Sequence, residues 1–222
     1  MSQTPAHEFH NPDLLRLIPT SSKSLIEIGC SSGALAREFK LISPECDYFG
    51  IEIDPNYAAL ARRFCDKTIC LDIEDAGEDF FISNRTRDCW IFGDTLEHLK
   101  NPYGVLDEIR KVIPQTGSVV ACIPNAQHWS IQLKLSVGDF RYEETGLLDK
   151  THLRWFTRQT IMEMFKNSGF EVIEGHPRIF NEPARERFLP IIGEMAKLAG
   201  SNPNIAINDS LPLQYVVRAV PV

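Results

Sequence analysis

The chain has 222 residues, of which 43% are hydrophobic and 24% charged. This is the composition of an ordinary globular protein, and it excludes disordered and fibrous classes. A formal net charge of -7 gives no general electrostatic reason to bind a phosphate backbone, so no nucleic-acid partner is expected. The length predicts one domain over residues 1–222, with a helical leader over about 1–22 and an insertion over about 181–212.

The sequence contains no run of the roughly 20 apolar residues that a membrane-spanning helix needs. Its first twenty residues lack the cationic start and apolar core of a signal peptide, so a cytoplasmic location is predicted. The six cysteines form no C-x-x-C pair and mostly lie in apolar segments, where a reduced thiol behaves as a small hydrophobe. Neither a disulfide framework nor a zinc site is predicted.

From residue 24 onward, short apolar segments alternate with segments of helical periodicity. This pattern is typical of a parallel sheet covered by helices. A short helix is expected over 11–18, ahead of the sheet. Five strands are expected in succession, over 24–28, 47–53, 68–71, 89–93 and 118–123. Apolar residues at three- and four-residue spacing predict helices over 34–41, 55–65 and 103–112.

The last third of the chain predicts a helix and two more strands. Thr157 is placed to cap a helix that runs to about Asn167, and Gly169 ends it. Strands are expected over 170–179 and 213–220. Between them the sequence predicts a helical stretch over 185–199 and a Gly/Asn/Pro-rich loop over 200–212. This long connection either carries a binding function or is a solvated insertion, and both interpretations stay open.

A tight glycine turn follows the first expected strand, in the segment SLIEIGCSSGALAREF over 24–39. Glu27 lies near the end of the strand, and Gly29 and Gly33 let the chain turn sharply and a ligand approach the backbone. A dinucleotide fingerprint would have a glycine at position 31, where this chain has Ser31. A dinucleotide-dependent enzyme is therefore the weaker interpretation.

Acidic residues follow the next two strands. Glu52 lies nineteen residues beyond Gly33, the spacing expected of a carboxylate that accepts hydrogen bonds from ribose hydroxyls. Asp72, in the segment CLDIED, is placed to reach the base of the same nucleoside. A purely structural role, as a strand-end charge or a loop carboxylate, is the alternative for each.

Taken together, these segments resemble the class I, seven-stranded S-adenosylmethionine-dependent methyltransferases. The resemblance runs from about Leu25 to Val220. The segment IEIGCSSG resembles the first motif of the family, with Ser31 in place of the middle glycine. The segment GIEID resembles the family's ribose-binding strand end, and CLDIED resembles its adenine-side loop. The fourth-strand motif, which borders the reacting methyl group, is similar to DCWIFGDTLEHLKNP, and the fifth strand to IPQTGSVVACIPN. The EHL segment and GLLDKTHLRWFT over 146–157 resemble quinone-biosynthesis O-methyltransferases and enzymes linked to bacterial surface sugars.

The resemblance implies a Rossmann-like α/β fold: a three-layer sandwich around a mostly parallel seven-stranded sheet of order 3-2-1-4-5-7-6, with the last strand antiparallel. It implies S-adenosylmethionine as cofactor and S-adenosylhomocysteine as product, bound at the carboxyl ends of the strands. The implied cofactor-binding residues are Glu27, Gly29, Cys30, Ser31, Gly33, Glu52, Ile53, Asp72, Ile73, Asp94 and Leu96. The implied acceptor is a small molecule or a glycan-linked group, with oxygen favoured as the accepting atom.

The candidate catalytic residues are histidines. A sulfonium methyl group is already activated, so the main task of such an enzyme is to align the acceptor and exclude water. Where a base assists, His suits neutral pH. His98, His128 and His152 lie in loops expected at the carboxyl ends of the strands, although His98 and His152 could instead stabilise those loops.

The segment after the fourth expected strand disfavours two other classes of methyltransferase, those that act on amino groups and those that depend on a metal ion. This segment, GDTLEHL, differs from the Asn-Pro-Pro-Tyr type of amino-group methyltransferases. No metal-ligand set is recognised near Asp94, so no metal ion is predicted. Two alternatives stay open, a non-catalytic member that binds S-adenosylmethionine without turnover and, more remotely, a nicotinamide-dependent oxidoreductase.

Overall fold

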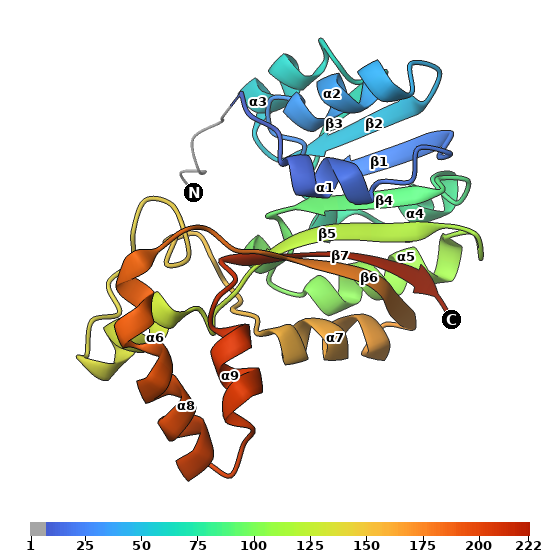
Figure 1. The fold of residues 1–222 in the computed structure, drawn as a ribbon. Coiled ribbons are helices and arrows are strands. Elements are labelled where there is room, and N and C mark those ends of the chain that lie inside the picture. Colours follow the sequence, from blue (N-terminus) through green and yellow to red (C-terminus); the bar gives the residue numbers. More distant parts are fainter. Residues whose placement is uncertain (1–7) are drawn as a thin grey trace.

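The computed structural model describes residues 8–222, so the first seven residues of the predicted leader lie outside the described part. Seven strands form one sheet in the order β3-β2-β1-β4-β5-β7-β6 (Figure 1). The strands are β1 (Ser24–Ile28), β2 (Asp47–Glu52), β3 (Lys67–Cys70), β4 (Cys89–Gly93), β5 (Ser118–Pro124), β6 (Phe170–Arg178) and β7 (Gln214–Pro221). Strands β1 to β5 pair in parallel, and β7 is antiparallel to both β5 and β6. The expected fold class is confirmed, including the strand order and the reversed last strand.

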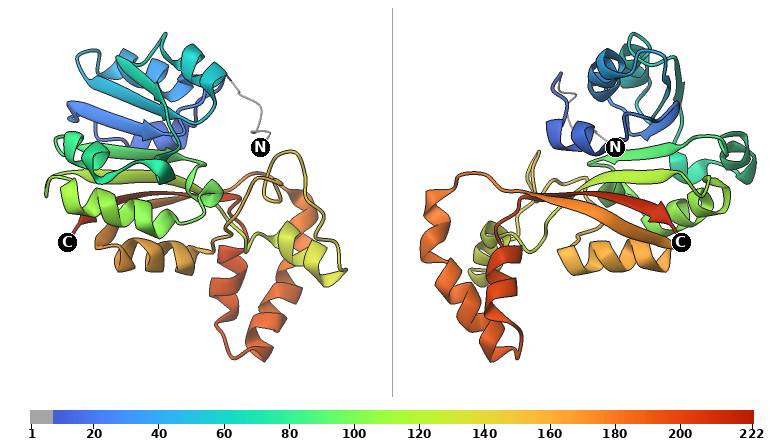
Figure 2. Two further views of the ribbon diagram at one scale, coloured as in Figure 1. Left: turned by 180° about the vertical axis from the view of Figure 1, so that it is seen from behind. Right: turned by 45° about the vertical axis from the view of Figure 1, so that its right-hand side comes forward.

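Helices cover both faces of the sheet (Figures 1 and 2). The α-helices are α1 (Pro12–Leu17), α2 (Ala34–Ile42), α3 (Pro55–Ala61), α4 (Glu78–Ser83), α5 (Pro102–Val112), α6 (Trp129–Ser136), α7 (Arg158–Asn167), α8 (Leu189–Leu198) and α9 (Pro203–Asp209). Short 3-10 helices are η1 (Ile73–Asp75), η2 (Leu96–His98) and η3 (Pro183–Arg187). Within residues 8–222, no helix combines the length and the apolar character needed to cross a membrane.

The core consists of two hydrophobic clusters, one on each face of the sheet. Because successive residues of a strand point to opposite faces, Ile26 of β1 joins the cluster under α4, α5 and α7, whereas Leu25 joins the one under α1 and α2. Trp90 and Phe39 are among the fully buried side chains of the two clusters. All six cysteines are free thiols, and only Cys70 is exposed.

The strands begin and end within one residue of the positions that the sequence predicts. The helix predicted over 55–65 is shorter in the structure, where α3 ends at Ala61. After Ala61 the chain turns toward β3, and the amide of Asp66 donates to the carbonyl of Tyr48 at 2.9 Å. Neither α4 nor α6 was expected.

The predicted loop over 200–212 is wrong, because this segment contains α9. The Asn202 side chain accepts hydrogen bonds from the amides of Asn204 and Ile205, and Pro203 occupies the first turn. Asn and Pro are residues of turns and equally of helix starts. The composition that indicated a loop is therefore that of a short capped helix.

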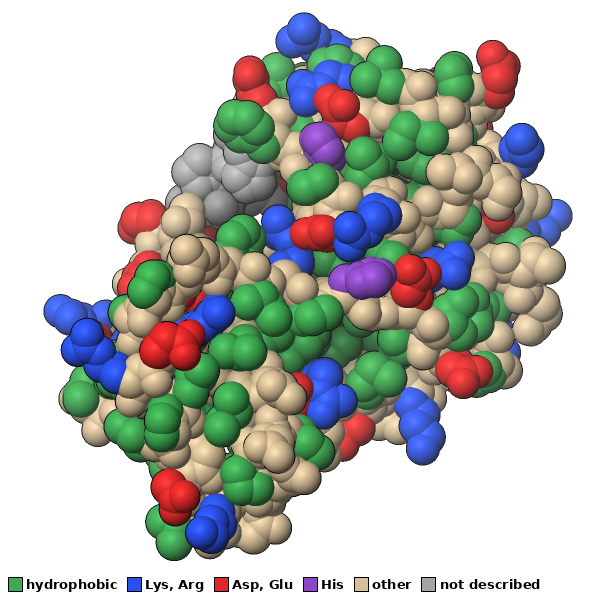
Figure 3. Space-filling model, viewed as in Figure 1, with side chains coloured by type: hydrophobic (Ala, Val, Ile, Leu, Met, Phe, Trp, Pro, Cys, Tyr) green, Lys and Arg blue, Asp and Glu red, His purple; other side chains and the backbone are tan. Residues whose placement is uncertain are grey.

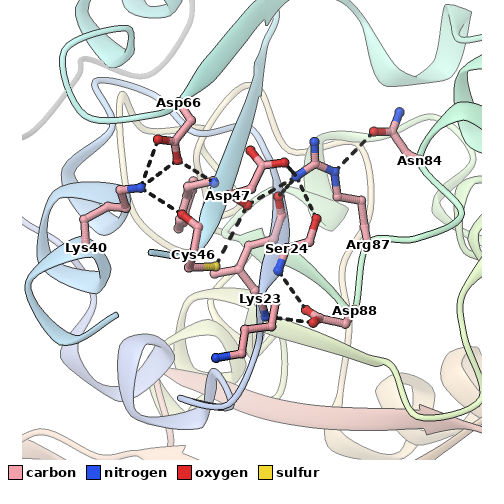
Figure 4. Close-up of polar contacts among 11 residues, drawn as sticks. Lys23, Ser24, Lys40, Cys46, Asp47, Asp66, Asn84, Arg87 and Asp88 are labelled. Carbon is pink, nitrogen blue, oxygen red and sulfur yellow. Dashed lines mark hydrogen bonds and ion pairs between the residues drawn. The ribbon is translucent and has the colours of Figure 1, made fainter. Parts of the chain in front are cut away.

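A polar network closes the amino edge of the sheet (Figure 4). Arg87 donates from Nη1 to Ser24 Oγ at 2.9 Å and pairs with Asp47 Oδ2 at 2.7 Å. Asp88 accepts from the amides of Lys23 and Ser24. These contacts join the starts of β1 and β2 to the segment that enters β4.

At the opposite, carboxyl edge of the sheet, α6, η3, α8 and α9 form a separate group of helices that projects beyond the strands (Figures 1 and 2). We call this group, residues 129–136 and 183–209, the helical lobe. The lobe and the segment over 139–156 lie beside the carboxyl ends of the parallel strands. In open α/β sheets this edge is where ligands bind.

Candidate functional site

The turn between β1 and α2 has an unusual backbone. Gly29, Ser31 and Gly33 all have positive φ, at 76°, 48° and 80°. A Cβ on Gly29 would lie 2.6 Å from Oγ1 of Thr95, and one on Gly33 would lie 3.0 Å from Cα of Ala61. Glycine is therefore required at both positions by the backbone conformation and by close packing within the protein, in addition to any ligand that approaches the turn.

Glu52, at the end of β2, holds this turn in place. Its side chain is buried, with the residue 3% exposed. Oε2 accepts a hydrogen bond from the amide of Ser31 at 2.7 Å, and Oε1 accepts one from the amide of Asp54 at 3.0 Å. A left-handed residue other than glycine costs roughly 1–2 kcal/mol, which the charged hydrogen bond to Ser31 offsets. Since a carboxylate has about four acceptor positions, Glu52 can still accept hydrogen bonds from a ligand.

Glu27 lies in β1, the strand that leads into the turn, and is also buried. The hydroxyl of Tyr48 donates to its Oε2 at 2.8 Å. Burial raises the pKa of Glu27 to about 8, the Tyr48 hydrogen bond opposes this rise, and the charge of Glu52 adds to it. In the absence of a ligand, Glu27 is therefore largely protonated at neutral pH, whereas Glu52 is the acceptor for backbone amides.

The other residues expected near the cofactor differ in what they expose. Ile53 is 49% exposed, directly after Glu52, so its side chain is free to pack on a ligand. Ile73 and Leu96 are buried in the core, and only their backbone can face a ligand. The Cys30 side chain packs against Gly50, where a Cβ would lie 2.7 Å from Cys30 Sγ, and its thiol donates to the carbonyl of Ser31 at 4.0 Å.

Asp72 and Asp94 occupy the ends of β3 and β4. The Asp72 side chain caps η1 by accepting from the amide of Glu74 at 3.0 Å. Asp94 has a φ of 52° and accepts from Gln214 Nε2 and from Cys122 Sγ. Both acidic residues therefore have structural roles within the protein, an alternative that the sequence left open for Asp72.

Thr95 connects the turn after β4 to the turn after β1. It was not among the site residues predicted from the sequence. Its Oγ1 donates to the carbonyl of Ile28 at 2.9 Å, and its side chain packs against Gly29. The turn after β4 is thereby attached to the turn after β1. A threonine after a strand carries no signal of this role, since its partners are distant in the sequence.

The structure brings His98 and His152 together beside Glu97. The centroids of the two imidazole rings are 4.8 Å apart, and Nε2 of His152 lies 4.0 Å from Oε1 of Glu97. The amides of Leu153 and Arg154 donate to the carbonyl of Glu97 at 2.8 and 3.0 Å, and so fasten the segment over 146–156 to η2. This contact between distant segments creates a polar cluster at the carboxyl end of β4.

Burial governs the protonation of this cluster. The residue Glu97 is 1% exposed, and neither oxygen of its carboxyl group has a hydrogen-bond partner within residues 8–222. Burial raises the pKa of Glu97 well above its usual value, and the charges of Asp94 and Asp149 add to the rise. Burial also lowers the pKa of His98 and of His152, so both imidazoles are neutral at neutral pH.

His128 does not join this cluster. It is buried at the start of α6, where Nε2 lies 3.1 Å from Oε2 of Glu182 and Nδ1 lies 2.8 Å from Oγ of Ser130. Trp129 Nε1 donates to the same Glu182 oxygen at 2.9 Å. Burial lowers the pKa of His128, an effect that Glu182 opposes. His128 thus connects the start of α6 to Glu182, the residue before η3, and only two of the three candidate histidines lie together.

Comparison with known proteins agrees with this architecture. A family model described as a methyltransferase domain matches residues 6–175. An uncharacterized protein of Methanocaldococcus jannaschii is 23% identical over 159 residues, which are 71% of this chain and 69% of that protein.

Two solved structures share the fold. A SAM-dependent methyltransferase from Archaeoglobus fulgidus superposes with a TM-score of 0.63 at 15% identity, over 94% of this chain and 91% of that one. The magnesium protoporphyrin IX methyltransferase of Synechocystis PCC 6803, crystallised with bound SAH, superposes with a TM-score of 0.59 at 11% identity, over 95% of this chain and 80% of that one. Because the family model matches well over half of the chain, this protein belongs to the methyltransferase-domain family.

Proposed function

We propose that this protein transfers a methyl group from S-adenosylmethionine to an oxygen atom of a small-molecule or glycan-linked acceptor. The observation that carries the proposal is the left-handed turn over 29–33, joined to the buried carboxylate of Glu52 at the carboxyl ends of β1 and β2. Family membership supports the reaction type, and the related structure with bound SAH supports the cofactor.

The cofactor brings a methyl group on a positively charged sulfur, which is already activated for transfer. The residues of this chain fit such a molecule. Glu52 has acceptor positions left for ribose hydroxyls, and the exposed Ile53 beside it offers an apolar surface for the adenine. Glu27 lies behind the turn, where its buried carboxyl group would become a favourable partner for the cofactor's ammonium group by losing its proton.

The acceptor is proposed to bind on the side of His98 and His152. His98 lies in the segment that resembles the family's methyl-bordering motif, and the ring of His152 packs against it with centroids 4.8 Å apart. On the same segment as His152, Trp155 is partly exposed and lies within 6.0 Å of Phe140, measured between ring centroids. An aromatic wall of this kind suits a flat or apolar acceptor. The related magnesium protoporphyrin IX methyltransferase, whose name includes such a compound, supports a small-molecule acceptor.

The first test is calorimetric titration with S-adenosylmethionine, S-adenosylhomocysteine and NAD. We expect the two adenosyl compounds to bind and NAD not to bind. Glu52→Ala is expected to weaken binding by about 1–3 kcal/mol, because a buried charged acceptor is removed. Glu171→Ala, a carboxylate on the edge strand β6, is the control and should bind as the wild type does.

A comparison of ligands separates recognition of the ribose from support of the turn. The wild type should bind S-adenosylhomocysteine more tightly than its 2′-deoxy derivative, and Glu52→Ala should have lost that preference. If the variant binds both more weakly but keeps the preference, Glu52 only supports the turn. Binding of NAD alone, or of none of the compounds, would refute the proposed cofactor.

A further inference from the structure

Glu97, His98 and His152 form a compact set of possible metal ligands. Each offers one ligand atom, and these atoms all lie within 4.8 Å of one another. No metal ion was predicted from the sequence, because no metal-ligand set is recognisable near Asp94, and His152 lies far from Glu97 and His98 along the chain. Only the contact between η2 and the segment over 146–156 brings the third side chain into place.

The hydrogen bonds of His98 determine which of its ring nitrogens is free. Nδ1 lies 3.2 Å from the carbonyl of Thr151 and 3.0 Å from its Oγ1. The Thr151 hydroxyl donates its proton to Oδ1 of Asp149 at 2.6 Å, so toward His98 it can act only as an acceptor. Two acceptors therefore face Nδ1, which must carry the proton, and Nε2 has its lone pair free.

The same arrangement recurs at His152. Its Nδ1 lies 3.3 Å from the carbonyl of Leu147, an acceptor, so the proton again belongs on Nδ1. The lone pair of Nε2 then faces Oε1 of Glu97, at 4.0 Å. Metal-binding histidines have this pattern, in which the non-ligating nitrogen donates to a carbonyl or a carboxylate and thereby fixes the ring.

The carboxyl group of Glu97 is evidence for a cation that is independent of the histidine orientations. Both of its carboxyl oxygens are buried, and in the described part of the chain neither has a hydrogen-bond partner. Leaving a buried polar group without a partner costs about 1–3 kcal/mol, and more for a charged group. His152 Nε2 lies 4.0 Å from Glu97 Oε1, which is too far for a direct hydrogen bond and leaves room for a cation that binds both atoms. The protein thus maintains an arrangement that a bound cation would stabilise.

We propose that Glu97, His98 and His152 bind a divalent transition-metal ion through the Glu97 carboxylate and the Nε2 atoms of the two histidines. Ligand atoms about 2.0–2.2 Å from a zinc ion at tetrahedral angles lie about 3.4 Å apart. His152 Nε2 and Glu97 Oε1 are 4.0 Å apart and all three ligand atoms lie within 4.8 Å of one another, so the side chains must close by up to about 1.4 Å (4.8 − 3.4) to reach this geometry. Two imidazoles and one carboxylate suit Zn²⁺, Co²⁺ or Fe²⁺ better than Mg²⁺ or Ca²⁺, which prefer oxygen ligands throughout.

A metal ion with three protein ligands keeps coordination positions for water or for an oxygen of the acceptor. It would lower the pKa of a hydroxyl bound there and so favour its loss of a proton before methyl transfer. This consequence rests on the proposed function, whereas metal binding itself does not. The two are therefore tested by different measurements.

The test is equilibrium dialysis of the untagged, S-adenosylmethionine-free protein against Zn²⁺ or Co²⁺, followed by elemental analysis. A Cys70→Ser background removes the exposed thiol as a competing ligand. We expect one ion per chain and, with Co²⁺, visible absorption bands of a low-coordinate site. His98→Ala, His152→Ala and Glu97→Gln should each weaken Co²⁺ binding at least about 10-fold, and Thr151→Val, which alters the support of His98, should weaken it about 10- to 100-fold.

His176→Ala is the matched control, because His176 also lies next to a carboxylate, at 3.2 Å from Glu174, but outside the cluster. It should bind Co²⁺ as the parent does. The absence of stoichiometric binding by the parent, or equal binding by the His98→Ala and His152→Ala variants, would overturn the proposal. If the ligand variants fold poorly, the Tm supplies the test. Co²⁺ should raise the Tm of the parent protein, and it should raise the Tm of Thr151→Val by a smaller amount. Failure of S-adenosylmethionine to bind a chain that binds the ion would refute only the proposed function.

Discussion

Two buried glutamates at the same edge of the sheet have different hydrogen-bond partners. Glu52 accepts hydrogen bonds from two backbone amides, whereas Glu27 has one hydrogen bond, from the Tyr48 hydroxyl. Burial without further donors raises the pKa of Glu27 to about 8. The sequence indicated both as cofactor-side residues, but the number of donors around each is set by β2 and by the turn over 29–33.

The raised pKa of Glu27 predicts how the free energy of unfolding depends on pH in the cofactor-free protein. The pKa of Glu27 rises from 4.5 to about 8 on folding, so its contribution is fully present below about pH 4.5 and is lost as the pH rises through about 8. Each pKa unit corresponds to about 1.4 kcal/mol, and the total loss is therefore several kcal/mol. Glu27→Gln removes this titration and should make the free energy of unfolding flatter between pH 5 and pH 9.

Urea unfolding of the wild type and Glu27→Gln at pH 5, 7 and 9 measures the effect. Other titrating groups contribute equally to both proteins, so only the difference between the two curves is informative. Parallel curves would show that Glu27 has the same pKa in the folded and unfolded chains.

At the scale of elements, the turn over 29–33 is determined by what packs against it. Gly33 begins α2 and contacts α3, and a Cβ there would lie 3.0 Å from Cα of Ala61. Gly138 has a similar φ, 74°, but nothing lies within 4 Å of where its Cβ would be. The two glycines separate the cost of backbone conformation from the cost of contact between helices.

We expect Gly138→Ala to destabilise the protein by only about 1–2 kcal/mol, because only the left-handed backbone opposes it. Gly33→Ala should cost clearly more, because α2 and α3 must also move apart, and it should weaken S-adenosylmethionine binding. Thermal unfolding and calorimetry of both variants check this. Equal destabilisation of the two would mean that α3 adjusts to the added methyl group without cost.

The elements of the sheet were the most predictable part of the molecule. Buried parallel strands are short apolar runs with polar ends, and this local pattern placed every strand within one residue. The helices of the lobe were less predictable. In α9 the chain uses Asn202 and Pro203 as helix-start residues, and α6 is held by Glu182, a partner distant in the sequence.

At the scale of the whole molecule, the helical lobe depends on a few polar attachments. Asn125, at the end of β5, donates from Nδ2 to the carbonyls of Asp209 and Pro212, both at 2.8 Å. Glu182 accepts from Trp129 Nε1 and lies 3.1 Å from His128 Nε2. Beyond these attachments the lobe exposes large apolar side chains, visible as green in the lower left of Figure 3; Ile191, Met195, Leu198 and Ile205 are among those exposed on α8 and α9.

Loss of one attachment should therefore loosen the lobe without unfolding the sheet. Glu182→Ala removes the partner of the ring nitrogens of buried His128 and half-buried Trp129, at a cost of about 1–3 kcal/mol. We expect faster amide hydrogen exchange in α6 and α8, and unchanged exchange in β1, β4 and β5. Glu186→Ala, an exposed neighbour paired with Arg185, is the control. Uniformly faster exchange throughout the chain would contradict a separable lobe.

The sequence by itself determined the alternation of strands and helices, the glycine turn after β1, and the acidic residues at the strand ends. These are local features, set by burial periodicity, by backbone freedom and by residues that follow one another in the chain. Only the tertiary structure decided which polar side chains meet. It placed His152 beside Glu97 and His128 beside Glu182, and it left the Glu97 carboxyl group without hydrogen-bond partners among the residues that the structure describes. Such contacts join residues dozens of positions apart, and the packing of whole elements fixes them.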